Sequence, residues 1–359
     1  MNPKQASIHS FFPTLKKDGS TLELRRFFYL NWSNQYSPKM QAVWLHDRPK
    51  DVNFIQEVKW EQVRKTHTFY LCGYFPDVKD SRFDVPHEPK YKNISNLKSH
   101  LQKSIRKGNE QLALSTAIHL IKMNPVELFR RLPIIMIEDT ILHESFSTLV
   151  WIMVSVSLSS GSFRLKKYMY EWVLGVIYMM AKTDRKDVIE YDESIDGERI
   201  ISKLESYGSL KKDEEISVLY SMNLRIAYGG MECDMRMFQQ YAHIWFQRFQ
   251  SNSMDLSDPT RVEEMPKIKI RNILFTSVRW LELEDWDLSA IDFHCAPKII
   301  EFMQKRFPDI DETEMKKIIW ENASSINFRT PTSIYRSDLW IDMKSHLQRT
   351  QRYLLDSSF

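Results

Sequence analysis

Hydrophobic and polar residues follow two different patterns along the chain, and the pattern changes near residue 92. From Leu22 to about Pro86, short runs rich in β-branched and aromatic residues (QAVWLH, FIQEVKW and HTFYLCGYF) are interrupted by Pro and Asp. Runs of this kind, bounded by turn-forming residues, are typical of strands. We therefore expect a small α+β unit over residues 21–92.

From Asn96 onward the hydrophobic residues follow the helical period instead. They recur at four-residue spacing, beginning with Leu97, Leu101 and Ile105, and this spacing predicts amphipathic helices. Further helices are expected at 146–158, 165–181 and 234–249. Polar stretches are interpreted as surface loops at 184–198 and 251–264. The chain is thus expected to be mainly α, with a multi-helix body over residues 93–359.

Turn and cap residues mark the first helix boundaries of this body. Gly108-Asn109 predicts a turn between two helices. Asn124-Pro125 predicts an N-cap followed by proline at the first helical position, and Glu127 is placed to complete a capping box.

Two further helix boundaries are expected, at Pro133 and at Gly229-Gly230, and the second can be interpreted as a connection or as a ligand site. Pro133 is expected to kink or end the helix in which it lies. Gly229-Gly230 predicts a tight turn before a helix capped by Asp234. A helix N-terminus attracts phosphate, but a turn of two glycines is more often only a connection.

The composition narrows the class of fold and of partner. The chain has 359 residues, of which 43% are hydrophobic and 27% charged, so it is long enough to bury a core. Only 9 residues are glycine, whereas doubly wound nucleotide-binding folds need glycine where the backbone approaches phosphate. The net charge of +3, from 50 basic and 47 acidic residues, does not identify a nucleic-acid binder by itself. Any DNA contact must come from a local patch.

The cysteines and the hydropathy of the chain indicate in which cellular compartment the protein is expected. Cys72, Cys233 and Cys295 are far apart in the sequence, which favours an intracellular reducing environment over a disulfide framework or a zinc ribbon. The richest apolar stretch starts at Phe146 and is shorter than the roughly 20 residues that span a bilayer, so it is interpreted as a buried helix. The start of the chain lacks the apolar run of a secretory signal. No membrane partner is expected.

The first dozen residues contain the stretch QASIHSFF, which places three large apolar side chains where no core is near. Its spacing is Gln5, then Ile8, then the adjacent Phe11 and Phe12. This spacing resembles the PIP box, by which replication and repair proteins bind the sliding clamp PCNA, and all four positions match. The resemblance implies that Gln5 takes the glutamine position, Ile8 the aliphatic position and the two phenylalanines the aromatic pair.

The physical chemistry of this stretch is consistent with clamp binding. A single 3₁₀ turn brings residues i and i+3 to one side, so Ile8 and Phe11 form a compact apolar fork with Phe12. Residues 1–20 are therefore interpreted as a clamp-binding peptide and its tether, in which Lys16 and Lys17 add attraction to an acidic rim or to nearby DNA. The alternative is that the apolar side chains fold back onto the surface of this protein.

A second resemblance covers residues 97–142. This segment is similar to the helical region that follows the ATPase module in clamp-loader-like AAA+ proteins of the MgsA and Werner-helicase-interacting type. The matching residues are Lys103, Ser104, Arg106, Ala113, Ala117, Pro125, Arg130, Arg131, Leu132, Glu138 and Asp139. No GxxxxGK[ST] loop is present in the sequence, so ATPase activity is not implied. The resemblance implies at most a helical, collar-like body, and the alternative is a coincidental match between two amphipathic hairpins.

Basic residues of the same region are the candidate contact to nucleic acid. They are Lys103, Arg106, Lys107, Arg130 and Arg131. Such a patch acts through charge and counterion release rather than through base reading. The alternative is a solvated helix face whose cations pair with carboxylates such as Glu110 and Glu127.

Evidence for catalysis is sparse. Glu138, Asp139, His143 and Glu144 lie within seven residues of the sequence, a density that a metal-dependent nuclease uses, although acidic residues at a helix junction are often caps. His294-Cys295 is interpreted as a satisfied histidine and a buried thiol, since no second His/Cys pair has ligand spacing. We therefore expect no catalytic residue, no bound metal and no cofactor.

These features together predict a non-enzymatic accessory protein of DNA replication or repair, located in the nucleus or in a viral replication compartment. Its N-terminal peptide is expected to bind the sliding clamp, and its helical body to contact DNA or another replication protein. Two alternatives remain open. One is a clamp-recruited metal-dependent nuclease that uses Glu138, Asp139 and His143, and the other is a structural subunit of an oligomeric assembly.

Overall fold

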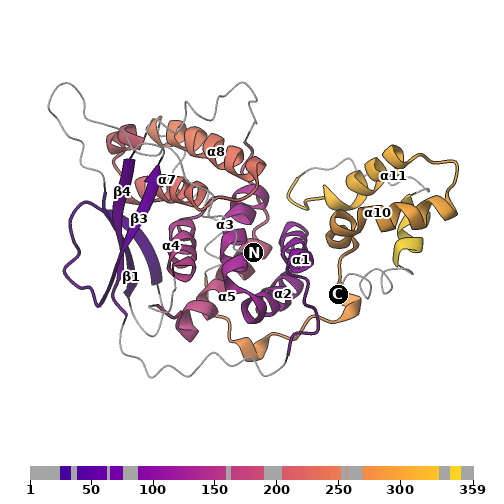
Figure 1. Cartoon of the computed structure of the whole chain (residues 1–359), viewed down its shortest axis with the longest axis horizontal. Coiled ribbons are helices and arrows are strands. Elements are labelled where there is room, and N and C mark those ends of the chain that lie inside the picture. The colour runs from indigo at the N-terminus through magenta and orange to yellow at the C-terminus, as the bar shows by residue number, and fades with distance from the viewer. Residues whose placement is uncertain are drawn as a thin grey trace. The chain divides into compact units, whose positions relative to one another are not determined.

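The computed structural model describes residues 25–33, 39–62, 65–75, 88–158, 163–189, 204–251, 256, 270–330 and 340–348 (Figure 1). The proposed clamp-binding residues Gln5, Ile8, Phe11 and Phe12 lie outside these described residues, as do Lys16 and Lys17.

The chain divides into two compact units, and each unit combines three separate stretches of sequence. The sheet unit comprises Met1–Asp80, Leu142–Arg164 and Asp187–Lys267. The helical unit comprises Ser81–Ile141, Leu165–Lys186 and Ile268–Phe359. This division differs from the linear one expected from the sequence, because two helices from later in the chain pack on the N-terminal sheet.

The sheet unit contains a strand at each of the three short apolar runs that predicted one, and one further strand before them (Figure 1, indigo). The strands are β1 (Phe27–Ser33), β2 (Lys39–Leu45), β3 (Phe54–Gln62) and β4 (Lys65–Gly73). Their order in the four-stranded sheet is β2-β1-β4-β3. The pairs β1–β2 and β3–β4 are antiparallel, whereas the two central strands β1 and β4 are parallel. Together with the many helices, this sheet confirms a mainly α protein with a small sheet near the N-terminus.

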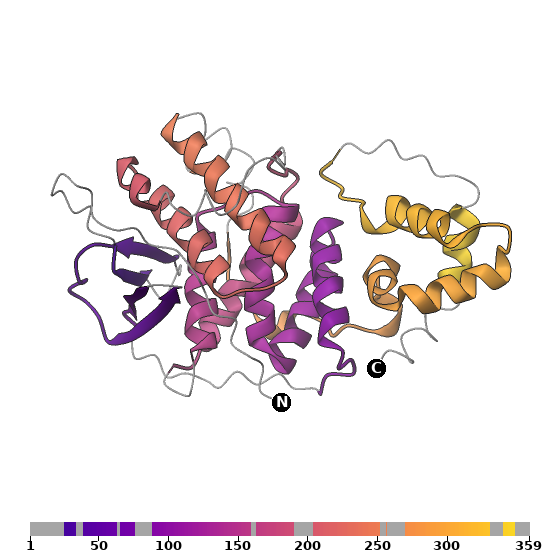
Figure 2. The ribbon, with the colours of Figure 1, turned by 45° about the horizontal axis from the view of Figure 1, so that its top comes forward.

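Two helices, α4 (Ser145–Ser157) and α7 (Asp213–Ala227), pack on the sheet (Figures 1 and 2). Trp44 of β2 is fully buried between them and the sheet, and its ring stacks on Phe28 with the centroids 4.5 Å apart. Its backbone N–H donates to the Ser217 hydroxyl at 3.0 Å. The backbone N–H of Ala42 donates to the Thr148 hydroxyl at 3.0 Å. Helix hydroxyls therefore satisfy backbone donors of the edge strand β2 that a further strand would otherwise pair.

The remaining regular elements of the sheet unit are α8 (Glu232–Gln250) and the 3₁₀ helix η1 (Leu204–Ser209), and α8 packs on α7. The apolar stretch from Phe146 forms α4, and its side chains are buried as expected. No described helix has both the length and the apolarity required to cross a bilayer.

The helical unit is organised around α1 (Ile94–Arg106), which contacts α2 (Glu110–Met123), α3 (Pro125–Asp139), α5 (Lys167–Lys182) and α10 (Leu288–Arg306). Its shorter elements are α11 (Glu312–Ile319), the π-helix η4 (Trp320–Ser324), the 3₁₀ helices η2 (Phe275–Ser277) and η3 (Leu283–Asp285), and a helical segment over 340–348. Leu97, Leu101 and Ile105 of α1 are completely buried, so the predicted four-residue period marks the core face of this helix.

Several predicted boundaries are confirmed. Gly108 has a positive φ of 71°, and the side chain of Asn109 caps α2. The side chain of Asn124 caps α3, which has Pro125 at its start. The capping box differs from the expectation, because the carboxylate of Glu127 accepts a hydrogen bond from Lys98 Nζ at 2.6 Å.

Two other boundaries differ in part from the sequence-based prediction. Of the two outcomes expected at Pro133, a kink or an end of the helix, the second is wrong, because helix α3 runs through Pro133 to Asp139. Helix α8 starts at Glu232, and Asp234 lies in its first turn rather than at the N-cap. The expected turn before α8 is confirmed, since Gly229 and Gly230 have φ values of 69° and 155°.

A glycine inside α5 allows a close backbone crossing in the helical unit. The segment before η2 runs across this helix, and the Ile273 N–H donates to the Glu171 carbonyl at 3.0 Å. A Cβ atom on Gly175 would lie 2.1 Å from the Arg271 carbonyl oxygen. Only glycine permits this contact without a shift of backbone.

Candidate functional site

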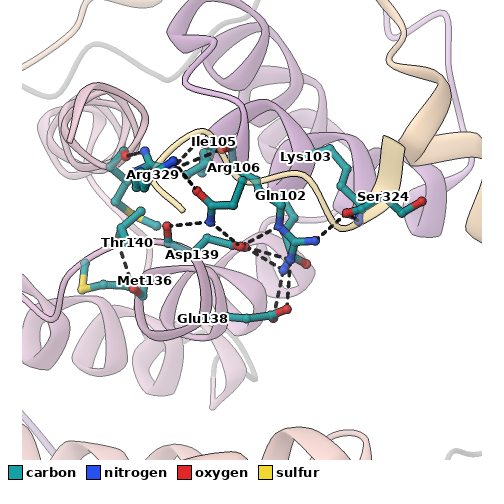
Figure 3. A network of polar contacts seen from close by, with 12 residues as sticks. Gln102, Lys103, Ile105, Arg106, Met136, Glu138, Asp139, Thr140, Ser324 and Arg329 are labelled. Atoms are coloured by element: carbon teal, nitrogen blue, oxygen red, sulfur yellow. Dashed lines mark hydrogen bonds and ion pairs between the residues drawn. The ribbon is translucent and has the colours of Figure 1, made fainter. Parts of the chain in front are cut away.

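A buried polar network joins three parts of the helical unit (Figure 3). Arg106, at the end of α1, donates from Nε to Asp139 Oδ1 at 2.6 Å and from Nη2 to Glu138 Oε1 at 2.9 Å. Its Nη1 donates to the backbone carbonyl of Ser324 at 2.9 Å. The guanidinium therefore connects α1, the end of α3 and the end of η4.

The order of residues in α3 explains why a cation is required here. Glu138 and Asp139 are the last two residues of α3, where the negative end of the helix dipole disfavours carboxylates. Gln102, one turn before Arg106, donates from Nε2 to both carboxylates, at 2.9 Å and 2.8 Å. The Gln102 Oε1 atom accepts from Arg131. Both carboxylates are thus held by donors from α1.

The electrostatics of the network are those of a buried ion pair. Only 1% of the Asp139 side chain and 9% of the Arg106 side chain are exposed. Burial alone would lower the pKa of Arg106, but the charges and hydrogen bonds of Asp139 and Glu138 outweigh burial, and the pKa is raised. Removal of one partner of such a pair leaves an uncompensated charge in the interior.

Three residues of the predicted basic patch, Lys103, Arg106 and Lys107, contact groups of the protein itself. Arg106 and Lys103 are buried, and Lys103 donates from Nζ to the Ser324 carbonyl at 2.8 Å while its ammonium lies 5.8 Å from the centre of the Trp320 ring. Lys107 forms an ion pair with Asp287 at 2.8 Å. These cations bind to groups of the protein itself, at positions where the local sequence suggested exposed phosphate contacts or pairs with Glu110 and Glu127. Arg130 is partly exposed, as is Arg131.

The acidic residues of the nuclease alternative are similarly engaged. Both oxygens of Asp139 accept hydrogen bonds from Arg106 and Gln102. His143 belongs to the sheet unit, where its Nδ1 lies 2.8 Å from the Ser145 hydroxyl. Among the described residues, no group of three or more His, Cys, Asp or Glu side chains is arranged to hold a metal ion.

Arg329 belongs to the same region, and no motif in the sequence identified it. It donates from Nε to the Thr183 carbonyl at 2.5 Å, from Nη1 to the Ile105 carbonyl at 3.0 Å and from Nη2 to the Met180 carbonyl at 2.6 Å. Burial lowers its pKa to about 10. One guanidinium therefore caps the C-terminal ends of both α1 and α5, where a cation is favoured by two helix dipoles.

Asn327 completes the attachment of this segment. Its Nδ2 donates to the backbone carbonyl of Asp139 at 3.3 Å. Residues 324–330 thus connect to α1, α3 and α5 through carbonyl groups and Asp139. Four residues on which the clamp-loader-like resemblance depends, Lys103, Arg106, Glu138 and Asp139, lie in this one network. This network holds the ends of helices together. None of its side chains is a nucleophile with an adjacent base.

The sequence also offered two other candidate sites, the Gly229-Gly230 turn and the His294-Cys295 pair. The Gly229 carbonyl accepts a hydrogen bond from Arg225 Nη1 at 2.7 Å, so the turn before α8 is tied to the preceding helix. His294 and Cys295 lie in α10, and their side chains fall outside the described residues.

The helical unit also has a cleft beside the Lys107–Asp287 ion pair. Its lining includes Lys344, Glu284 and Trp340. Its charged lining side chains are of both signs, so the cleft has no single electrostatic preference.

Comparison of the chain with protein-family models, with curated proteins and with solved structures found no match.

Proposed function

We propose that the protein is a non-enzymatic accessory factor of DNA replication or repair that a sliding clamp recruits through residues 1–20. The observation that carries this proposal is the spacing of Gln5, Ile8, Phe11 and Phe12. Three large apolar side chains within five positions of a polar N-terminal segment are expected where burial occurs on another protein.

The affinity of such a peptide follows from its aromatic residues. Buried aromatic side chains remove roughly 150–250 Å² each from water, and apolar burial contributes about 25 cal/mol per Å². Part of this gain offsets the ordering of the peptide on binding. A dissociation constant on the order of micromolar is therefore expected, with Phe11 and Phe12 as the main contributors.

The body supports an accessory role more than a catalytic one. In the part of the chain that the structure describes, the candidate carboxylates Glu138 and Asp139 are held by Arg106 and Gln102. A body tethered to the clamp gains a high local concentration at its own second partner. This second partner is DNA or another replication protein.

The proposal is tested by calorimetric titration of the full chain into a PCNA-type sliding clamp. The double variant Phe11→Ala with Phe12→Ala is expected to weaken binding by at least about 100-fold, because two anchors of about 2 kcal/mol or more each are removed. The matched control is Ser7→Ala with Ser10→Ala, which changes the intervening positions of the same peptide. This control is expected to bind as the unchanged chain does.

The melting temperature of each variant is measured alongside. An unchanged melting temperature in the double phenylalanine variant assigns its loss of binding to the interface rather than to unfolding. Clamp binding that persists in this variant at its original affinity would overturn the proposal.

A further inference from the structure

The two edges of the sheet differ in how their backbone groups are satisfied. The strand order β2-β1-β4-β3 places β2 and β3 at the edges. On β2, the N–H groups of Ala42 and Trp44 donate to helix hydroxyls. On β3, no backbone hydrogen bond other than those to β4 is found among the described residues. An open edge of this kind is where a further strand can pair.

The residues of β3 that face the open edge follow from the hydrogen bonds of β4. The Tyr70 N–H donates to a backbone carbonyl just before β1 at 2.8 Å, so the backbone groups of Tyr70 face β1. These groups alternate in direction along a strand, so those of Phe69 face β3, where Phe69 pairs with Val58. The backbone groups of Glu57 and Lys59, on either side of Val58, therefore point to the open edge.

The open edge is long and regular. Strand β3 has nine residues and contains no proline. Its register with β4 runs from Phe54↔Gly73 to Gln62↔Lys65 without a bulge. Short length, proline and bulges are devices that protect edge strands from pairing, and charged side chains are another. Among these devices, the described part of β3 has only charges.

The charges are those of Glu57 and Lys59, which lie on the same face of the strand. Their side chains are 48% and 69% exposed, and Lys59 Nζ lies 3.8 Å from Glu57 Oε1. Two like charges here would repel a second copy of the strand. Opposite charges, two positions apart, can instead complement a second copy that runs in the opposite direction.

Val58 is the midpoint of β3, so an antiparallel pairing centred on Val58 overlaps the whole strand Phe54–Gln62 with that of a second copy. This register places Glu57 opposite Lys59 of the second copy and, by twofold symmetry, Lys59 opposite Glu57. Both residues have backbone groups that point to the open edge, so each facing pair also exchanges two backbone hydrogen bonds.

Other registers fit less well. A pairing centred on Glu57 or on Lys59 places that residue opposite its own copy, and like charges that face each other destabilise a strand pair. A pairing centred on Trp60 overlaps only residues 58–62 of the strand. Charge and overlap therefore both favour the register centred on Val58.

We infer that the protein forms a symmetric dimer through β3, in which the two four-stranded sheets join into one continuous sheet. The interface is self-complementary, as a twofold contact between identical chains requires. Dimer formation does not depend on clamp binding. Its consequence for recruitment rests on the proposed function, because a dimer presents two copies of residues 1–20 and gains avidity only if these bind the clamp.

Sedimentation equilibrium of the full chain tests the inference. The unchanged chain is expected to pass from the mass of one chain to the mass of two as its concentration rises. Lys59→Pro removes an N–H group that faces the open edge and leaves the hydrogen bonds to β4 in place. This variant is expected to remain a monomer. Circular dichroism at low concentration checks that it folds.

The register is tested by charge reversal. Glu57→Lys alone, or Lys59→Glu alone, is expected to weaken dimerisation at least about tenfold, because symmetry replaces two attractive pairs with two repulsive ones. An equimolar mixture of these two variants is expected to regain the original affinity, since every facing pair then has opposite charges. The matched control is Lys305→Glu, which reverses an exposed cation of α10, and it is expected to have no effect.

Three results would overturn the inference. One is the mass of a single chain at every concentration. Another is a dimer that persists at its original affinity in Lys59→Pro, which would assign the contact to a different surface. The third is a mixture of the two charge variants that stays monomeric. The Phe11→Ala, Phe12→Ala variant is expected to dimerise normally, so a failure of clamp binding and a failure of dimerisation are distinguished.

Discussion

Arg106 at the end of α1 and Asp139 at the end of α3 are joined by two hydrogen bonds, from Nε to Oδ1 at 2.6 Å and from Nη2 to Oδ2 at 3.2 Å. These residues are 33 positions apart in the sequence, and the Asp139 side chain is almost completely buried. The pair explains how a helix that ends in two carboxylates is accommodated in the interior of the helical unit.

The first prediction concerns this pair. Arg106→Met is expected to lower the free energy of unfolding by ~3–5 kcal/mol, because Asp139 is left buried without its cation. Urea denaturation measures the change. The matched control is Arg236→Met, which breaks the exposed ion pair with Glu232 and is expected to change stability by less than about 0.5 kcal/mol. Equal effects of the two variants would show that Arg106 is no more important than a surface cation.

Arg329 provides the second prediction. Arg329→Lys keeps the charge but loses the planar fork that reaches the ends of α1 and α5 together. Unsatisfied buried carbonyl groups are expected to reduce the free energy of unfolding by about 2 kcal/mol. The control is Arg271→Lys, because Arg271 is exposed and its guanidinium stacks on the Tyr178 ring. Full retention of stability in Arg329→Lys would mean that charge alone suffices at this position.

The third prediction concerns Gly175. A change from glycine to alanine inside a helix ordinarily stabilises a protein by about 1 kcal/mol. The sign is expected to reverse here, since the new Cβ would lie 2.1 Å from the Arg271 carbonyl oxygen. Thermal melting is expected to show a clear destabilisation. Gly229→Ala serves as the comparison, because Gly229 has a positive φ but open space around it, and it is expected to cost only about 1 kcal/mol of backbone strain.

His100 supplies a prediction about pH. Burial lowers its pKa to about 4, and its ring nitrogens contact the Thr116 hydroxyl at 2.7 Å and the Asp285 carbonyl at 3.2 Å. The unfolded chain takes up this proton near pH 6.5. Between these two pKa values the unfolded state binds more protons, so stability is expected to fall as the pH falls from about 6.5 to about 4.

The comparison variant for this pH effect is His100→Gln, which retains hydrogen-bonding groups but does not titrate. Its stability is expected to fall less steeply with decreasing pH than that of the unchanged chain, by up to about 1.4 kcal/mol per pH unit. Urea denaturation at several pH values between 4 and 7 gives both slopes. Parallel curves for the two proteins would show that His100 is not the titrating group.

The elements with strong local signals were predictable from the sequence. The four-residue period of α1, the turn at Gly108-Asn109 and the cap Asn124 depend only on neighbouring residues, and they appear where expected. The role of Arg106 was not predictable in this way, because its partners Glu138 and Asp139 meet it only after α1 and α3 pack together. Interpretation of the local sequence therefore placed Arg106 on the surface, whereas its side chain is buried.

The sequence of β1 also indicates that the sheet face opposite α4 and α7 is apolar, a feature that the sequence-based interpretation did not use. Residues 27–30 read FFYL, with no polar residue on either side of the alternation. A strand with two apolar faces is expected to be covered on both. Which side chains lie next to each other on this face follows only from the strand register, since Phe27 and Tyr70 become neighbours through the parallel pairing of β1 and β4.

Our main proposal is that residues 1–20 bind the sliding clamp. Its most direct test is displacement of the fluorescently labelled full chain from a PCNA-type clamp by an unlabelled peptide of residues 1–20. The account predicts complete displacement, with an inhibition constant close to the dissociation constant of the full chain. A peptide that fails to displace the bound chain, or a full chain that does not bind the clamp at all, would contradict it.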